Sequence, residues 1–255
     1  SKPKYSVKAS TGLKWAYKLH PIMSSQDYCS MIGYESVLKN KTMSQTEEAF
    51  GLIDNYTDWQ KEGLNSSPQI HQVQLSVSGG KNDITYYISG NYAQDVIMLN
   101  SNYTRLNLRS RINAKLSKRV DFSLNLAPSY TKTETPATNF MDFYRTPSFM
   151  PVRHTAATSA LTGKPIGSYA RGSDFSNVTY TREDGTTFTP SSSPFGSSNN
   201  NPRSLMDTEE RFREDYNLQA NASFNVQLMK GLVFTTSNGF FIKYRQNNQY
   251  RDYAA

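Results

Sequence analysis

The sequence predicts an all-β protein with small helical inserts, built as a segment of an antiparallel transmembrane β-barrel. Three observations lead to this fold class. About seven long stretches alternate apolar and polar residues, and the longest of them covers residues 216–228. The links between these stretches are alternately long and short along the chain. The chain is also rich in aromatic residues, with 17 Tyr and 13 Phe, and has a single Cys.

The stretch 216–228 sets the pattern for the rest of the chain. Every even position is apolar and every odd position is polar, which gives a period of two over the whole stretch. An α-helix would scatter such residues around its circumference, so the period indicates a strand. Strands of soluble domains usually have about 5–6 residues, whereas a strand that crosses an outer membrane needs about 9–11. The length and the polar Asn, Gln and Ser face therefore favour a membrane-spanning strand beside a wet lumen.

Six further strands and three helices follow from the same type of pattern. The predicted strands cover residues 4–17, 72–78, 84–92, 105–116, 121–126 and 232–244, and the strand at 216–228 extends upstream to about residue 208. Between the first two strands the period changes to that of a helix. Helices are expected at 24–38, 44–53 and 58–64, the first capped by Ser24 or Ser25. We interpret residues 18–66 as a helical extracellular loop insert.

The connections divide into two classes that alternate along the chain. The short ones cover residues 79–82, 117–119 and 229–231, and the long ones include the helical insert, a modest loop at 95–102 and a loop at 133–206. Outer-membrane barrels have short periplasmic turns and long extracellular loops. The pattern therefore predicts short turns at one end of the sheet and long loops at the other.

The alternation assigns side chains to two faces. We expect one face to be directed to lipid, through Leu106, Leu108, Leu124, Leu126, Leu218, Phe224 and Val226. The other face is expected to line the lumen, through Arg105, Asn107, Arg109, Arg111, Lys115, Asn217, Gln219 and Asn221. Solvation of these basic residues, or contact with another part of the protein, is the simpler interpretation, and contact with substrate is the alternative.

Composition and charge exclude several classes of protein and of binding site. The mean hydropathy is −0.65, and no run approaches the about 18 apolar residues of a transmembrane helix. The net charge of +7 raises the question of nucleic-acid binding, but no nucleic-acid motif is present. One Cys excludes an internal disulfide, the three His are widely spaced, and no cofactor site is expected. No signal peptide begins the chain, so export would require an N-terminus that lies elsewhere.

The loop at 133–206 holds the candidate contact residues. Aromatic and arginine side chains cluster in its first part, and aromatic faces stack on sugars while arginine binds carboxylates. We name Phe143, Tyr144, Arg145, Phe149 and Arg153 as candidates for contact with substrate or with a lid protein. Internal packing of the loop is the alternative. A hairpin is expected around Asp184-Gly185, and residues 196–201 are expected to be flexible.

Several motifs in fixed order resemble the SusC/RagA family of TonB-linked outer-membrane transporters. Residues 57–60 (Thr-Asp-Trp-Gln) and 75–80 (Leu-Ser-Val-Ser-Gly-Gly) are similar to the family's "DW…LSVSGG" signature. Residues 86–90, 103–109, 201–202 and 230–234, with Gly239, resemble the strands that follow it, and residues 2–7 resemble the segment after the plug domain. Residues 150–154 (Met-Pro-Val-Arg-His) depart from the family's usual Pro-Val-Tyr-Asn.

The resemblance implies that residues 1–255 are the N-terminal part of a barrel of roughly 22 strands, with the plug domain and TonB box lying before residue 1. Such a protein is located in the outer membrane of a Gram-negative, Bacteroidota-type bacterium with its loops extracellular. It imports bulky nutrients, such as oligosaccharides or peptides, with energy from the TonB complex. Its partners are a SusD-like surface lipoprotein and outer-membrane lipid.

Two other classes of function remain open from the residues. A secreted or surface β-domain that binds carbohydrate or protein would explain the alternation and the aromatic loop, but not the long strand or the one-sided loops. An enzyme is not expected, because no GxSxG turn and no cluster with metal-ligand spacing is present.

Overall fold

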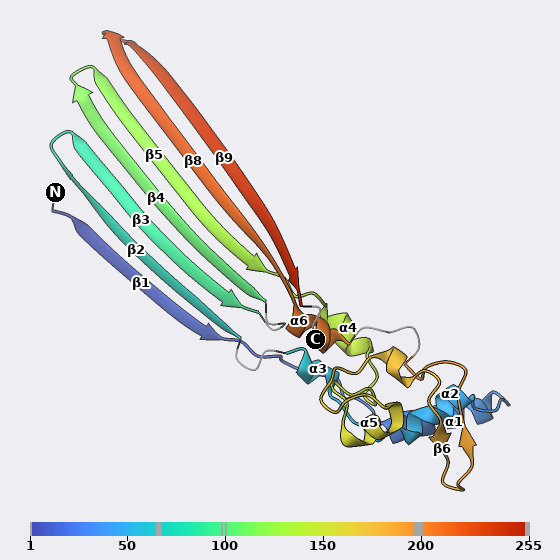
Figure 1. Cartoon of the computed structure of the whole chain (residues 1–255). Helices are drawn as coiled ribbons and strands as arrows, with labels where there is room; N and C mark the ends of the chain where they lie inside the picture. Colours follow the sequence, from blue (N-terminus) through green and yellow to red (C-terminus); the bar gives the residue numbers. More distant parts are fainter. Residues whose placement is uncertain (1, 65–67, 98, 100, 196–200, 253–255) are drawn as a thin grey trace. The chain divides into compact units, whose positions relative to one another are not determined.

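The computed structural model describes residues 2–64, 68–97, 99, 101–195 and 201–252. Its main feature is a seven-stranded sheet with the order β1-β2-β3-β4-β5-β8-β9 (Figure 1). Neighbouring strands from β1 to β8 pair antiparallel, and β9 is hydrogen-bonded to β8 at the edge of the sheet. The predicted fold class, a mostly antiparallel β-structure with seven long strands and small helices, is confirmed.

The strands are long, as a membrane crossing requires, and the helices are short. The large sheet contains β1 (Lys4–Leu13), β2 (Gln69–Lys81), β3 (Ile84–Val96), β4 (Asn102–Ser117), β5 (Val120–Glu134), β8 (Glu209–Met229) and β9 (Leu232–Arg251). The remaining elements are α1 (Ser25–Leu38), α2 (Gln45–Glu48), η1 (Ala49–Leu52), α3 (Trp59–Glu62), α4 (Phe140–Arg145), α5 (Ala156–Thr162), η2 (Gly172–Phe175), β6 (Tyr180–Thr181), β7 (Thr187–Phe188) and α6 (Pro202–Thr208). No helix among the described residues is long and apolar enough to cross a membrane.

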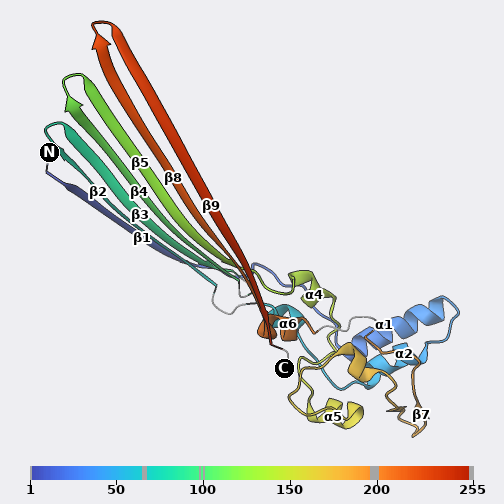
Figure 2. The ribbon, with the colours of Figure 1, turned by 45° about the horizontal axis from the view of Figure 1, so that its top comes forward.

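Three tight turns join β2 to β3, β4 to β5 and β8 to β9, and all three lie at the same end of the sheet (Figure 2). Asn82 and Gly231 in two of these turns have positive φ angles of 54° and 86°. Asn and Gly adopt this conformation more easily than other residues. The three longer connections leave from the opposite ends of the strands, as the sequence predicted.

From β1 to β8 the register keeps the alternation of neighbouring strands in phase, so that residues of the same face lie opposite each other. On β5, Leu124 lies opposite Ile112 of β4 and Ala222 of β8. On β3, Ile88 lies opposite Val77 of β2 and Ser110 of β4. Because side chains alternate along each strand, this register collects the apolar positions on one face and the polar positions on the other.

The chain divides into two compact units. The first is the sheet, formed by residues 1–15, 66–135 and 211–249, and the second contains residues 16–65, 136–210 and 250–255. The second unit, which we call the loop unit, therefore combines the helical insert with the long loop. The largest fully buried side chains belong to it, among them Trp59, Tyr180, Phe143, Phe149 and Phe175.

The helices of the insert begin close to the residues at which the sequence predicts them. Ser24 caps α1 by accepting a hydrogen bond from the backbone N–H of Asp27. Ser44 and Glu47 form a capping box at the start of α2, in which each side chain accepts from the other's backbone N–H. The hydrogen bonds that the Glu47 carboxylate accepts from the backbone N–H and the hydroxyl of Ser44 hold the pKa of this carboxyl below its ordinary value. These caps explain why helices begin where the sequence predicted.

One detail of the strand prediction was wrong. The first strand ends at Leu13 rather than at residue 17, and one further backbone hydrogen bond, from the N–H of Lys14 to the carbonyl of Pro68, follows its last pair. Trp15 and Tyr17 consequently lie outside the strand. The expected hairpin is confirmed: β6 and β7, of two residues each, pair antiparallel with Gly185 in the turn between them. Of the stretch expected to be flexible, residues 196–200 lie outside the described residues.

Candidate functional site

The polar face of the sheet carries the basic residues that the sequence placed on one parity of β4. Arg111 lies opposite Tyr87 of β3 and Asn125 of β5, and Lys115 lies opposite Asp121 of β5. The other predicted lumen residues occupy the same face, since Asn107 pairs with Ser129 and Ser129 pairs with Asn217. The structure therefore brings all eight predicted lumen residues onto one face of β4 and β8.

Cations exceed anions on this face. Asp215 is buried and accepts a hydrogen bond from Arg245 Nε at 2.6 Å, while Arg213 Nε lies 3.2 Å away and Lys243 Nζ 4.0 Å away. One carboxylate is thus shared by three cations. Arg109 and Arg111 form no ion pair with any carboxylate of the described residues. The polar face therefore presents positive charge that the sheet itself does not neutralise.

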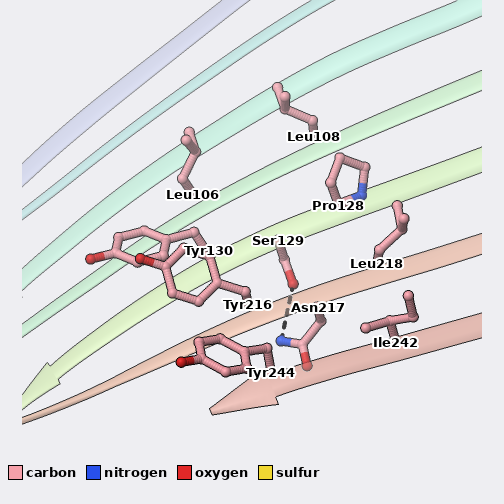
Figure 3. Close-up of a pocket in the computed structure, with 10 residues that line it drawn as sticks. All are labelled: Leu106, Leu108, Pro128, Ser129, Tyr130, Tyr216, Asn217, Leu218, Ile242 and Tyr244. Carbon is pink, nitrogen blue, oxygen red and sulfur yellow. Dashed lines mark hydrogen bonds between the residues drawn. The ribbon is translucent and has the colours of Figure 1, made fainter. Parts of the chain in front are cut away.

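The apolar face holds a shallow groove of about 360 Å³ across β4, β5, β8 and β9. Figure 3 shows aliphatic side chains at one end of it and three tyrosine rings gathered at the other. The tyrosines are Tyr130, Tyr216 and Tyr244, with ring centroids 4.9 Å apart for the first pair and 6.1 Å for the second. The hydrogen bond from Asn217 Nδ2 to Ser129 Oγ, 3.4 Å long, joins the neighbouring strands (Figure 3).

The tyrosines form a row across the sheet, and a second aromatic pair lies closer to the turns. Tyr130 lies opposite Leu106 and Tyr216, and Leu106 lies opposite Tyr92. Phe122 and Phe224 face each other with ring centroids 4.8 Å apart.

Tyr216 and Phe224 are separated by eight residue steps, or roughly 27 Å along a strand. A strand tilt of about 40° reduces this to roughly 20 Å, which is close to the apolar band of about 25 Å in outer-membrane barrels. The apolar face thus has the dimensions of a membrane-facing surface bordered by aromatic residues.

The predicted contact residues of the long loop separate into buried and exposed ones. Phe143 and Phe149 are buried within the loop unit, so packing explains their presence and no face is free for a ligand. Tyr144 is 51% exposed, and Arg145 is also exposed. Arg153 is exposed, but its guanidinium lies 3.8 Å from the centroid of the Tyr169 ring. Contact with substrate or a lid remains a prediction for Tyr144, Arg145 and Arg153.

Trp59 is the central residue of the loop unit, a role that sequence reasoning missed. Its indole Nε1 donates to the carbonyls of Pro147 and Met150, both at 3.1 Å, and its ring lies 6.3 Å from that of Phe143. Arg182, the residue after β6, links the long loop to the helical insert a second time, since its Nη2 donates to Glu48 Oε2 at 2.9 Å. The Trp59 position was visible in the motif at 57–60, but no sequence signal pointed to its partners.

Tyr180 supplies a test of the loop unit's core. Its hydroxyl is buried and has no hydrogen-bond partner among the described residues, and burial raises the pKa of the phenol above its ordinary value. Because the folded state holds this proton more tightly than the unfolded state, the stability of the fold decreases as the pH rises above the unfolded pKa of about 10 toward the raised folded pKa.

We expect Tyr180→Phe to stabilise the loop unit by about 1 kcal/mol at neutral pH, because it removes an unsatisfied hydroxyl. It should also reduce the loss of stability near pH 11. Hydrogen exchange of residues 172–195 in the full-length protein measures both effects, with Tyr34→Phe, at an exposed site, as the control. Faster exchange in Tyr180→Phe at neutral pH would contradict this description of the core.

Comparisons with known proteins agree with the geometry. No family model matches the chain. The TonB-dependent receptor P3 of Formosa agariphila is 42% identical over 71 residues, which make up 28% of this chain and 7% of the receptor.

Solved structures share the fold over almost the whole chain. The structure of the RagAB peptide transporter aligns with a TM-score of 0.59 and 15% identity, covering 97% of this chain and 29% of that one. The closed-closed state of the RagAB peptide importer aligns with a TM-score of 0.57 and 13% identity, covering 98% and 29%. The chain thus spans less than a third of the proteins it matches. Together these findings confirm the resemblance to TonB-linked transporters that the motifs indicate.

Proposed function

We propose that this chain, which resembles the SusC/RagA-type TonB-linked transporters in motifs and in fold, forms part of the wall of an outer-membrane importer. Seven long strands with one apolar face are the observation that carries this proposal. In a soluble sheet of one layer, such a face would remain exposed as a large apolar patch. Phe240, Ile242 and Tyr244 of β9, for example, are each about half exposed. Contact with lipid removes this apolar face from water and so stabilises it.

The two faces then take different roles. The apolar face, with Leu106, Leu108, Leu124, Leu126, Leu218, Phe224 and Val226, contacts outer-membrane lipid. The tyrosine row borders it at the level of the lipid headgroups, where amphipathic rings are favoured. The polar face, with its arginines and amides, lines the water-filled lumen.

The loop unit is extracellular in this proposal and provides the surface toward a partner. The partner is a SusD-like surface lipoprotein, and the cargo is an oligosaccharide or a peptide too bulky for diffusion. In this proposal Tyr144 and Arg145, which are exposed on the loop unit, contact either of them. The TonB complex supplies the energy through a plug domain outside the described chain.

The experiment is to isolate the native polypeptide that carries this sequence from fractionated cells and to measure its intact mass. We expect it in the outer-membrane fraction, with a mass several times 28.8 kDa. Deleting its gene should abolish uptake of one class of oligosaccharide or peptide while uptake of small diffusible nutrients continues. A native chain found in the soluble fraction would overturn the proposal and favour a soluble binding domain.

A further inference from the structure

Basic side chains gather at the end of the sheet where the three tight turns join the strands (Figure 2). Each turn contains or directly follows at least one of them, and the set consists of Lys81, Lys118, Arg119 and Lys230. All four side chains are exposed, and none forms an ion pair with a carboxylate of the described residues. Every turn therefore presents positive charge that the sheet does not neutralise.

Carboxylates are scarce at this end of the sheet. Along the chain, the acidic residues nearest the three turns are Asp83, in the first turn, and Asp121 of β5. Asp121 lies opposite Lys115 on the polar face. On β1, which begins at the same end, Lys4 adds a further positive charge to the polar face, opposite Ser78. Positive charge thus exceeds negative charge at the turns, so this end of the sheet favours an anionic partner.

An exposed apolar side chain lies close to the lysine of each turn. These apolar side chains are each about half exposed. They are Ile84, directly opposite Lys81, Leu116, two residues before Lys118, and Leu232, two residues after Lys230. A lysine can bury its aliphatic stem along apolar surface while its ammonium group stays at the polar boundary. Each turn therefore combines a surface for an acyl chain with a cation beside it.

The three lysines are displaced from one another along the strands in a regular way. One row of directly paired residues crosses the sheet from β2 to β8, and it consists of Lys81, Ile84, Ala114, Phe122 and Phe224. Lys118 lies four residues beyond this row on β4, which is about 13 Å along the strand and about 10 Å across from β2. Lys230 lies six residues beyond the row on β8, about 20 Å along the strand and about 19 Å across.

This displacement matches the tilt of strands in a membrane. When strands are tilted, a row of paired residues is inclined to the membrane plane by the same angle, so a shift across the sheet offsets a shift along it. At a strand tilt of about 40°, the displacements given above bring the three lysines to within about 4 Å of one depth. The positive charges then form a band at the border of the apolar face, where the headgroups of one leaflet lie.

We propose that the tight turns bind the headgroups of anionic phospholipids in the leaflet that surrounds this end of the sheet. Under the proposed function, on which this inference rests, the apolar face already contacts lipid. An anionic phospholipid fits both features of a turn, because its phosphate group pairs with the ammonium group and its acyl chains cover the apolar neighbour. A soluble anion would match the charge but not the apolar side chains beside it.

The test measures which phospholipid lies beside Lys81. The fluorophore bimane is attached to Ile84→Cys in the full-length protein, after Cys29 and any cysteine outside this chain have been replaced by Ser. The protein is reconstituted in bilayers that contain nitroxide-labelled phosphatidylglycerol or nitroxide-labelled phosphatidylcholine, and quenching of bimane gives the relative affinity of the two lipids at this position. We expect an about fivefold preference for phosphatidylglycerol at low salt, which high salt should weaken.

Substitutions of Lys81 connect the preference to its charge. Lys81→Gln should reduce the preference for phosphatidylglycerol to less than about twofold, whereas Lys81→Arg, which keeps the charge, should retain it. Lys4→Gln is the matched control, because it removes the same charge at the same end of the sheet but from the polar face. Equal loss of the preference in Lys4→Gln and Lys81→Gln would overturn the inference, since the preference would then come from the overall field of the protein.

Two further outcomes would overturn the inference while the proposed function stands. One is equal quenching by the two lipids when Lys81 is present, because quenching by either lipid still shows that the face contacts the bilayer. The other is loss of the preference on addition of millimolar soluble glycerol phosphate, which would identify a site for free anions. Failure of the proposed function looks different: the protein would be missing from the outer-membrane fraction, and neither lipid would quench the label.

Discussion

Leu126→Arg in the full-length protein is expected to prevent assembly into the outer membrane. Leu126 lies on the apolar face of β5, between Ser110 and Ala220 of the neighbouring strands and midway between the two aromatic rows. An arginine at the midplane of a barrel's lipid face costs about 2–4 kcal/mol. Outer-membrane fractions probed for the folded protein should contain strongly reduced amounts of the variant.

The neighbouring residue provides a matched control. Ala127 lies opposite Gln219 on the polar face, so Ala127→Arg introduces the same side chain one position away, toward water. We expect this variant to assemble at close to the wild-type level. Equal assembly of both variants would mean that the apolar face does not contact lipid, and equal failure of both would mean that any arginine in β5 disrupts the sheet.

Trp59→Ala is expected to unfold the loop unit while the sheet stays intact. The indole is 1% exposed, and its Nε1 bonds two carbonyls of the long loop. Removing a buried aromatic side chain of this kind costs about 3–5 kcal/mol. Limited proteolysis of intact cells should then cleave within residues 136–195, where we expect the wild type to be resistant.

Tyr144→Ala is the control for this change, because Tyr144 belongs to the same loop but is 51% exposed. Its loop should keep the wild-type resistance to protease, while binding of a partner or cargo is weakened if Tyr144 contacts one. Resistance of Trp59→Ala equal to that of the wild type would contradict the role assigned to Trp59.

The sheet was predictable because strand structure leaves a periodic signal. Residues 216–228 alternate without interruption, and the same alternation in neighbouring strands determines which residues face each other once the tight turns fix the register. The cationic positions of β4 were placed on one face for the same reason. Helix starts were predictable where a capping residue was present, as at Ser24 and Ser44.

The organisation of the loop unit could not be read from the sequence. α4, α5 and α6 have only six or seven residues each, which is too short for a helical period to be detected. The burial of Phe143 and Phe149 depends on contacts with residues far away in the chain, such as the stacking of Phe149 on Phe50 with centroids 4.9 Å apart. An exposed aromatic cluster and a buried one look the same in a sequence.

The most direct test of the account is the accessibility of spin labels along β5 in the full-length protein, reconstituted in a lipid bilayer. Cys29 is first replaced by Ser, and single cysteines are then introduced at each position from 122 to 129. We predict high accessibility to oxygen at the even positions, which would face lipid, and high accessibility to a water-soluble nickel complex at the odd ones. Accessibility to the nickel complex that does not alternate between even and odd positions would contradict a membrane-spanning strand.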